Sequence, residues 1–95
     1  MSIQEFIEST EGSLMPADLP LHVQALWYDR KGNWKKAHDL IDHLGDRESA
    51  HVHAYLHRKE GDLWNAGYWY NRAGQQIPEV SLEKEWAQLA VLYLP

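Results

Sequence analysis

The chain has 95 residues and a net charge of −5, and it contains five Trp, five Tyr and no Cys. This length, with 44% hydrophobic residues, predicts a single domain over residues 1–95 and excludes a disordered tail, a disulfide scaffold and cysteine chemistry. The sequence has no cluster of Lys and Arg that would predict nucleic-acid binding, and it has no run of about 20 apolar residues that would predict a membrane helix. It also has no basic leader that would predict export, so we expect a cytoplasmic protein.

The first predicted element is a short helix over about residues 3–9. Ser2 and Glu5 have the spacing of a capping box, in which each side chain accepts a hydrogen bond from the backbone N–H of the other residue. Residues 10–18 are predicted to form a loop, because they include Gly and Pro and have no apolar periodicity. Asp18 is expected to cap the next helix.

The remaining helices are predicted from residues that favour helix starts and helix ends. Pro20 fits the first turn of the second helix, where its missing N–H is harmless, and Gly32 is expected to end that helix. Asn, Asp and Ser accept hydrogen bonds from the free N–H groups of a helix start. The expected caps and helices are Asn33 with 34–44, Asp46 with 47–59, Asp62 with 63–73 and Ser81 with 82–94. No segment alternates with period two, so the predicted fold class is all-α.

An internal repeat is visible when the chain is compared with itself at an offset of 29 residues, which places Ala25 on Ala54. At this offset, small residues, glycines, helix-cap residues and bulky residues coincide in two units. Each unit is predicted to be an antiparallel helical hairpin. The hairpins are expected over 19–44 and 46–74, and a last helix over 80–94 is expected to cap them. The other coincident pairs are Gly32 with Gly61, Asn33 with Asp62, Trp34 with Leu63, Ala37 with Ala66 and Ile41 with Tyr70.

The repeat resembles the tetratricopeptide repeat (TPR) over about residues 19–78. The first unit matches at Ala25, Tyr28, Gly32, Trp34, Ala37 and Ile41, and the second at Ala54, Gly61, Asp62, Leu63, Ala66, Tyr70, Ala73 and Pro78. The period here is shorter than the roughly 34 residues of that family, because the link at Gly45 and Asp46 is short. The resemblance implies a TPR-like superhelical array with a concave surface that binds peptides or helices. Residues 51–74 also resemble a group of small bacterial proteins of unassigned role.

The resemblance implies that the first helix of each hairpin lines a partner-binding groove. Its lining would be His22, Leu26, Asp29 and Arg30 from one helix and His51, Tyr55, Arg58 and Lys59 from the next. Arg58 and Lys59 offer donors to a carboxylate, Tyr55 offers a stacking surface, and the histidines add sensitivity to pH. We therefore predict a non-catalytic module that binds a protein or peptide and needs no cofactor. A solvated face with bases at the helix ends is the alternative interpretation.

Four aromatic residues crowd one predicted helix, and a small hairpin cannot bury them all: Trp64, Tyr68, Trp69 and Tyr70. One interpretation is that Trp69 and Tyr70 pack between helices, while Trp64 and Tyr68 cover adjacent edges of the core. The other is an exposed patch at Trp64 and Tyr68 that forms a homodimer or docks a protein partner. The sequence leaves both open.

Two of the six histidines have the spacing of metal ligands. His53 and His57 are four residues apart and share one helical face, and the candidate third ligands are His22, Asp29 and Glu48. Because none of these is clearly placed, packing of the rings between helices is the preferred interpretation. A His-based metal or small-ligand site remains the alternative function, as does an accessory subunit of an enzyme.

A catalytic group is not predicted. Asp39 and His43 are four residues apart and are expected to pair, and Ser49 is the one serine in the middle of the chain. A nucleophile of this kind needs a strained turn and an oxyanion-hole loop, and neither has a sequence signature here. We therefore expect a protein that is not an enzyme.

Overall fold

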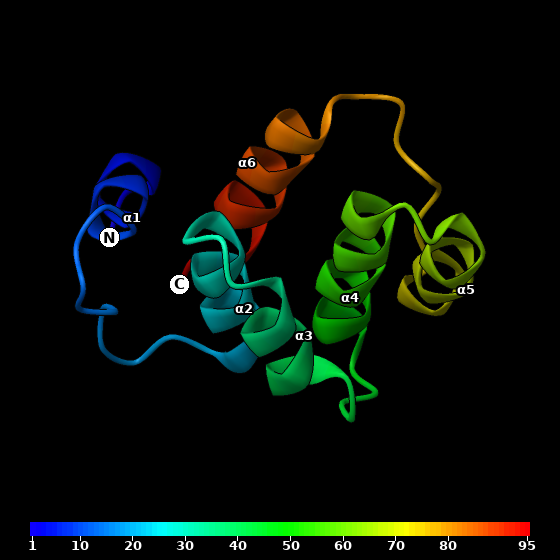
Figure 1. Ribbon diagram of the computed structural model, residues 1–95, viewed down its shortest axis with the longest axis horizontal. Helices are drawn as coiled ribbons and strands as arrows, with labels where there is room; N and C mark the ends of the chain where they lie inside the picture. The colour runs from blue at the N-terminus through cyan, green and yellow to red at the C-terminus, as the bar shows by residue number, and fades with distance from the viewer.

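The computed structural model describes residues 1–95 and contains six α-helices and no strands (Figure 1). The all-α prediction is confirmed. The helices are α1 (Ile3–Ser9), α2 (Leu21–Arg30), α3 (Trp34–Ile41), α4 (Arg47–Glu60), α5 (Leu63–Ala73) and α6 (Leu82–Tyr93). No helix combines the length and the apolar content that a bilayer crossing requires.

Most helix starts lie where the capping residues predict them. Ser2 and Glu5 form the capping box, with N–O distances of 2.9 and 3.1 Å between backbone and side chain. Four further side chains each accept a hydrogen bond from the backbone N–H three residues on, as predicted: Asn33, Asp46, Asp62 and Ser81. These bonds satisfy N–H groups that have no partner inside the helix.

Two predicted helix boundaries, the start of α2 and the end of α3, are wrong. Asp18 does not cap α2: its backbone is left-handed, with φ at 62°, and Pro20 is the N-cap residue, without a side-chain hydrogen bond. A carboxylate two residues ahead of the cap is too far along the chain to reach the first free N–H groups. Helix α3 ends at Ile41 instead of Leu44, because the N–H of Leu44 turns back to the Ile41 carbonyl at 3.0 Å.

The two hairpins repeat the same turn. Gly32 and Gly61 have φ values of 87° and 88°, a backbone conformation that favours glycine. The next residue in each unit, Asn33 or Asp62, donates its N–H to a carbonyl five residues back at 2.9 Å, as in a Schellman motif. The alanines of both units are buried where their helices cross: Ala25, Ala37, Ala54 and Ala66. One pair differs, since Trp34 is half-buried and Leu63 is exposed.

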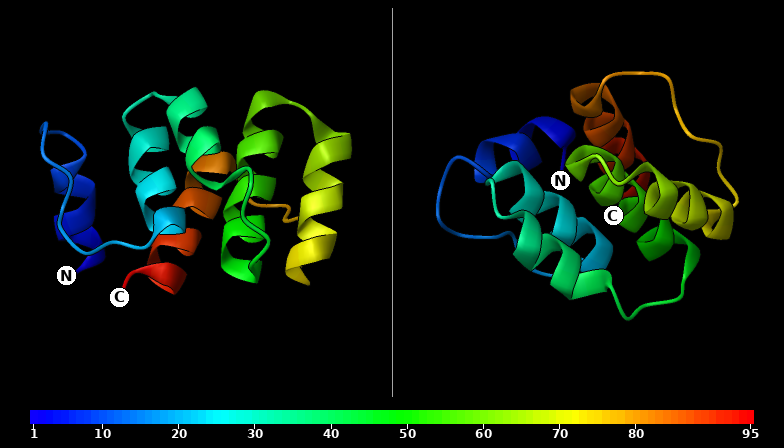
Figure 2. Two further views of the ribbon diagram at one scale, coloured as in Figure 1. Left: turned by 90° about the horizontal axis from the view of Figure 1, so that it is seen from below. Right: turned by 45° about the vertical axis from the view of Figure 1, so that its right-hand side comes forward.

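Helices α2 to α5 lie in a row with α5 at one end (Figure 2), and α4 packs against α2, α3 and α5. Helix α6 does not extend this row beyond α5, where a capping helix was expected. After the link over 74–81 it lies against α2 and α4, and α1 packs on it in turn (Figure 1). Trp86 fixes this arrangement, because its ring stacks on Phe6 and its Nε1 donates to the Leu26 carbonyl at 2.9 Å.

Candidate functional site

Helix α6 covers the predicted groove on α2 and α4. Leu26 has no exposed surface and Tyr55 is almost fully buried, so both are core residues and neither is accessible to a partner. Arg58 donates to Glu85 of α6 and to the Val80 carbonyl just before it. The resemblance implies a partner-binding groove at these residues, and in the structure the chain's own last helix covers part of them.

Two buried carboxylates organise the covered groove. Asp29 accepts hydrogen bonds from the Tyr55 hydroxyl at 2.8 Å and from Lys59 Nζ at 2.9 Å. Glu85 accepts them from the Tyr70 hydroxyl at 2.6 Å and from Arg58 Nη1 at 2.9 Å. The residues predicted to bind a partner's carboxylate therefore bind carboxylates of their own chain.

These carboxylates also change the ionisation of the tyrosines. Burial raises the pKa of Tyr55 above its usual value of 10.0, and the neighbouring Asp29 charge adds to this. Burial and the hydrogen bond to Glu85 raise the pKa of Tyr70 in the same way. Both hydroxyls therefore stay protonated and serve as donors.

The histidines predicted for the groove also face α6. His51 Nδ1 lies 2.8 Å from the Tyr93 hydroxyl, and the ring of His22 contacts the Tyr93 ring edge-on at 5.1 Å between centroids. Burial lowers the pKa of both histidines. Both histidines are half-buried in these contacts.

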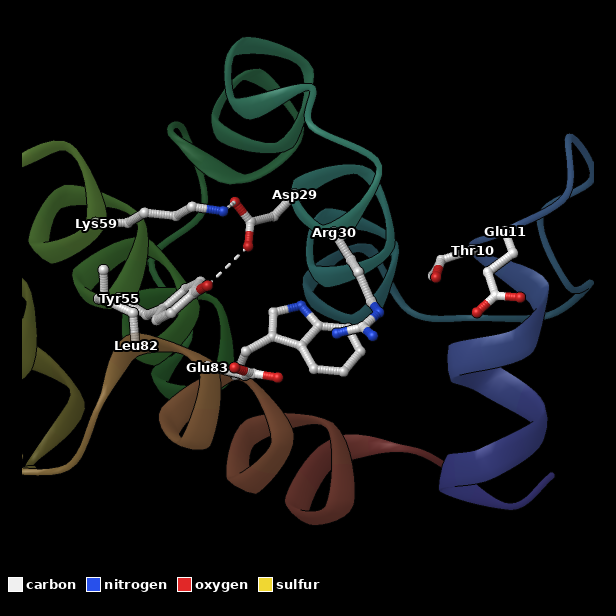
Figure 3. A pocket seen from close by; sticks show the side chains of 9 residues that line it. Thr10, Glu11, Asp29, Arg30, Tyr55, Lys59, Leu82 and Glu83 are labelled. Atoms are coloured by element: carbon white, nitrogen blue, oxygen red, sulfur yellow. Dashed lines mark hydrogen bonds and ion pairs between the residues drawn. The ribbon is translucent and has the colours of Figure 1, made fainter.

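A cleft of about 500 Å³ remains beside Asp29, with Arg30, Lys59 and the acidic Glu11 and Glu83 on its walls (Figure 3). Figure 3 shows Lys59 and Tyr55 directed at Asp29, which uses both of its oxygens. The exposed Arg30 guanidinium lies 4.9 Å from the centre of the Trp86 ring. The mixed charges of the walls and the full pairing of Asp29 leave no unsatisfied buried group for a ligand.

The aromatic residues of α5 divide between two faces. Tyr70 is buried and Trp69 is half-buried, whereas Trp64 is 79% and Tyr68 46% exposed. The exposed rings are nearly parallel, with 6.5 Å between centroids. Leu63 beside them is 64% exposed. The proposed patch at Trp64 and Tyr68 is therefore accessible on the outer face of α5.

The two histidines with metal-ligand spacing meet a third one. The rings of His53 and His57 stack with 4.8 Å between centroids, and His53 Nε2 lies 3.1 Å from His38 Nε2 of α3. The third histidine was not among the sequence candidates, and His22 lies against α6 instead. A signal in the sequence that could have pointed to His38 is its spacing of four residues from Trp34, on the helix that the repeat places against α4.

The expected Asp39–His43 pair is not formed. Asp39 pairs with Lys35 at 2.9 Å, and His43 lies 3.3 Å from Asp42. Ser49 is buried in the first turn of α4. No protein-family model, curated protein or solved structure matches the chain.

Proposed function

We propose that this protein is an interaction module of TPR-like type whose partner is a second copy of itself, bound through the outer face of α5. The observation that carries the proposal is the exposure of Trp64, 79% of whose surface is open to solvent. A large aromatic residue left in water beside Tyr68 and Leu63 is typical of a protein contact, since its burial is favourable.

The repeat architecture supports this location. In helical arrays each unit buries its apolar face against the next one, and the end units need a polar outer face to stay soluble. Helix α5 ends the row of hairpins (Figure 2), yet it exposes the aromatic side chains of Trp64 and Tyr68. We infer that another helix packs there, as a further unit of the array would.

The spacing of the exposed side chains favours a second copy as the occupant. Trp64, Tyr68 and Arg72 are four residues apart in turn, so they form one stripe along α5 that is symmetric about Tyr68. If two α5 helices meet antiparallel about a two-fold axis at Tyr68, Trp64 of each copy lies opposite Arg72 of the partner subunit. An Arg over a Trp face is an attractive cation–π pair. The stripe is thus complementary to itself, as a two-fold interface requires.

Light scattering and sedimentation across micromolar to millimolar concentrations test this proposal. We expect a monomer–dimer equilibrium that Trp64→Ala weakens about 30-fold, because the variant loses both symmetry-related Trp64 contacts, which together are worth about 2 kcal/mol. Arg72→Glu should weaken it too, whereas Arg72→Lys should retain part of it. Leu92→Ala is the matched control, because Leu92 is 60% exposed on α6.

Two results would contradict the proposal. A chain that stays monomeric at every concentration has no self-association to explain. A dimer that Leu92→Ala dissociates and Trp64→Ala does not would place the contact on α6.

A further inference from the structure

We propose that His38, His53 and His57 bind one divalent transition-metal ion of the Zn²⁺ type at the junction of α3, α4 and α5. This site is separate from the outer face of α5, and it does not depend on self-association. Three imidazoles are a common ligand set for zinc, with water in the fourth position. The sequence contains no Cys that would compete for the ion.

The nitrogens are close enough to share one ion. One ring nitrogen from each histidine lies within 4.8 Å of those of the other two, and His38 Nε2 and His53 Nε2 are 3.1 Å apart. Two nitrogens bound to one tetrahedral zinc at 2.0–2.1 Å are separated by about 3.3 Å. Small side-chain rotations therefore bring the three rings to a metal without moving the helices.

The histidines are not explained by packing alone. His53 is 2% exposed, and its Nδ1 is a buried nitrogen without a hydrogen-bond partner. Leaving a buried polar atom unpaired costs free energy, and an apolar ring would fill the same volume without that cost. The Nε2 atom of the same ring faces His38 Nε2, and an ion bound there would use the polar character of the rings that packing alone does not require.

The surroundings hold the rings in place. Glu60 Oε1 lies 3.0 Å from His57 Nδ1, which leaves Nε2 of that ring free to bind an ion. A carboxylate behind a histidine is the usual outer partner of a metal ligand, because it fixes the tautomer and the ring orientation.

Two tryptophans complete the walls of the site. The Trp69 ring stacks on His53 with 4.0 Å between centroids, and the Trp34 ring stacks on His38 at 4.9 Å. Trp34 is itself anchored, since its Nε1 donates to the Leu56 carbonyl at 2.8 Å. The rings are therefore oriented before any ion arrives, which lowers the entropic cost of binding.

The main test is metal binding by chelator-treated protein made without a His tag. Titration with Zn²⁺ followed by elemental analysis should give one ion per chain, and Co²⁺ should give the visible absorption of a tetrahedral site. His38→Ala should abolish stoichiometric binding, whereas His43→Ala should not, because His43 is exposed at the end of α3. Glu60→Gln should weaken the affinity by about 10–100-fold.

A second measurement avoids the risk that a variant fails to fold. In ¹⁵N NMR of the unaltered protein, Zn²⁺ should shift the imidazole nitrogens of the three ligands and leave those of His22, His43 and His51 in place. The proposal is overturned if fewer than one ion binds, if His38→Ala and His43→Ala bind Zn²⁺ equally, or if other histidines shift instead.

Discussion

The two sides of α4 carry polar clusters of opposite character. Toward α2 and α6, the carboxylates of Asp29 and Glu85 each accept two hydrogen bonds, and every oxygen is paired. Toward α3 and α5, the histidine cluster leaves His53 Nδ1 buried and unpaired. Both clusters combine buried polar groups with aromatic rings, yet one is complete and the other lacks a partner.

This difference distinguishes a cluster that supports the fold from a cluster that is suited to bind a ligand. A fully paired buried network fixes the positions of the helices that contribute to it, and it has no remaining donor or acceptor for a ligand. A buried cluster with an unpaired atom is a place where the fold is less stable than it could be, and such places are enriched in functional sites. We therefore assign a supporting role to the carboxylate side, and the histidine side is where we propose the metal site.

The largest expected effect is on the carboxylate side. Glu85→Ala removes the acceptor of Arg58 and Tyr70, and breaking a buried pair by removing one partner costs about 3–5 kcal/mol. Urea denaturation should show this loss in the free energy of unfolding. Glu83→Ala, at an exposed position of the same helix, should change it by less than about 0.5 kcal/mol. Equal effects of the two changes would contradict the assigned supporting role.

Unfolding at alkaline pH tests the carboxylate side of α4 through its two buried tyrosines. Because the pKa values of Tyr55 and Tyr70 are raised in the folded chain, their contribution to stability is complete below pH 10 and falls as the pH rises further. The loss should reach about 1.4 kcal/mol per pH unit for each tyrosine. Denaturation between pH 9 and 12 measures it, and absorbance near 295 nm should show both hydroxyls ionising with unfolding. Ionisation of all tyrosines before unfolding would contradict the prediction.

The smallest effect is expected on the histidine side. His53→Phe keeps a ring against Trp69 and removes the unpaired nitrogen, and it also removes the 3.1 Å contact with His38 Nε2, so the stability of the metal-free protein should change by no more than about 1 kcal/mol. The same change should eliminate the stabilisation that Zn²⁺ gives to the unaltered chain. Thermal unfolding with and without Zn²⁺ measures both. A large loss of stability without metal would show that His53 supports the fold.

Much of the helical structure could be predicted from sequence because its signals are local. Caps such as Asn33 and Asp62 act within one turn, and the glycine turns at Gly32 and Gly61 need a few residues. The start of α2 was predicted incorrectly because Asp18 and Pro20 both favour helix starts, and the sequence does not say which of them ends the loop.

The site was harder to predict because its partners are distant in the chain. Arg58 and Lys59 were predicted to donate to a carboxylate of a partner, and in the structure they donate to Glu85 and Asp29 of the same chain, 27 and 30 residues away. His38 is 15 residues from His53 and belongs to the other hairpin. Placing either contact required knowing where α6 and α3 pack, which no local pattern specifies.

The return of α6 across α2 and α4 divides the contacts of the fold into local and long-range ones. Each hairpin joins helices that are neighbours in the chain, whereas Trp86 meets Leu26 across 60 residues, and contacts between distant residues slow folding. A chain truncated before residue 82 would leave Tyr70 without its acceptor Glu85 and would uncover the part of the apolar core that Trp86 and Leu89 complete.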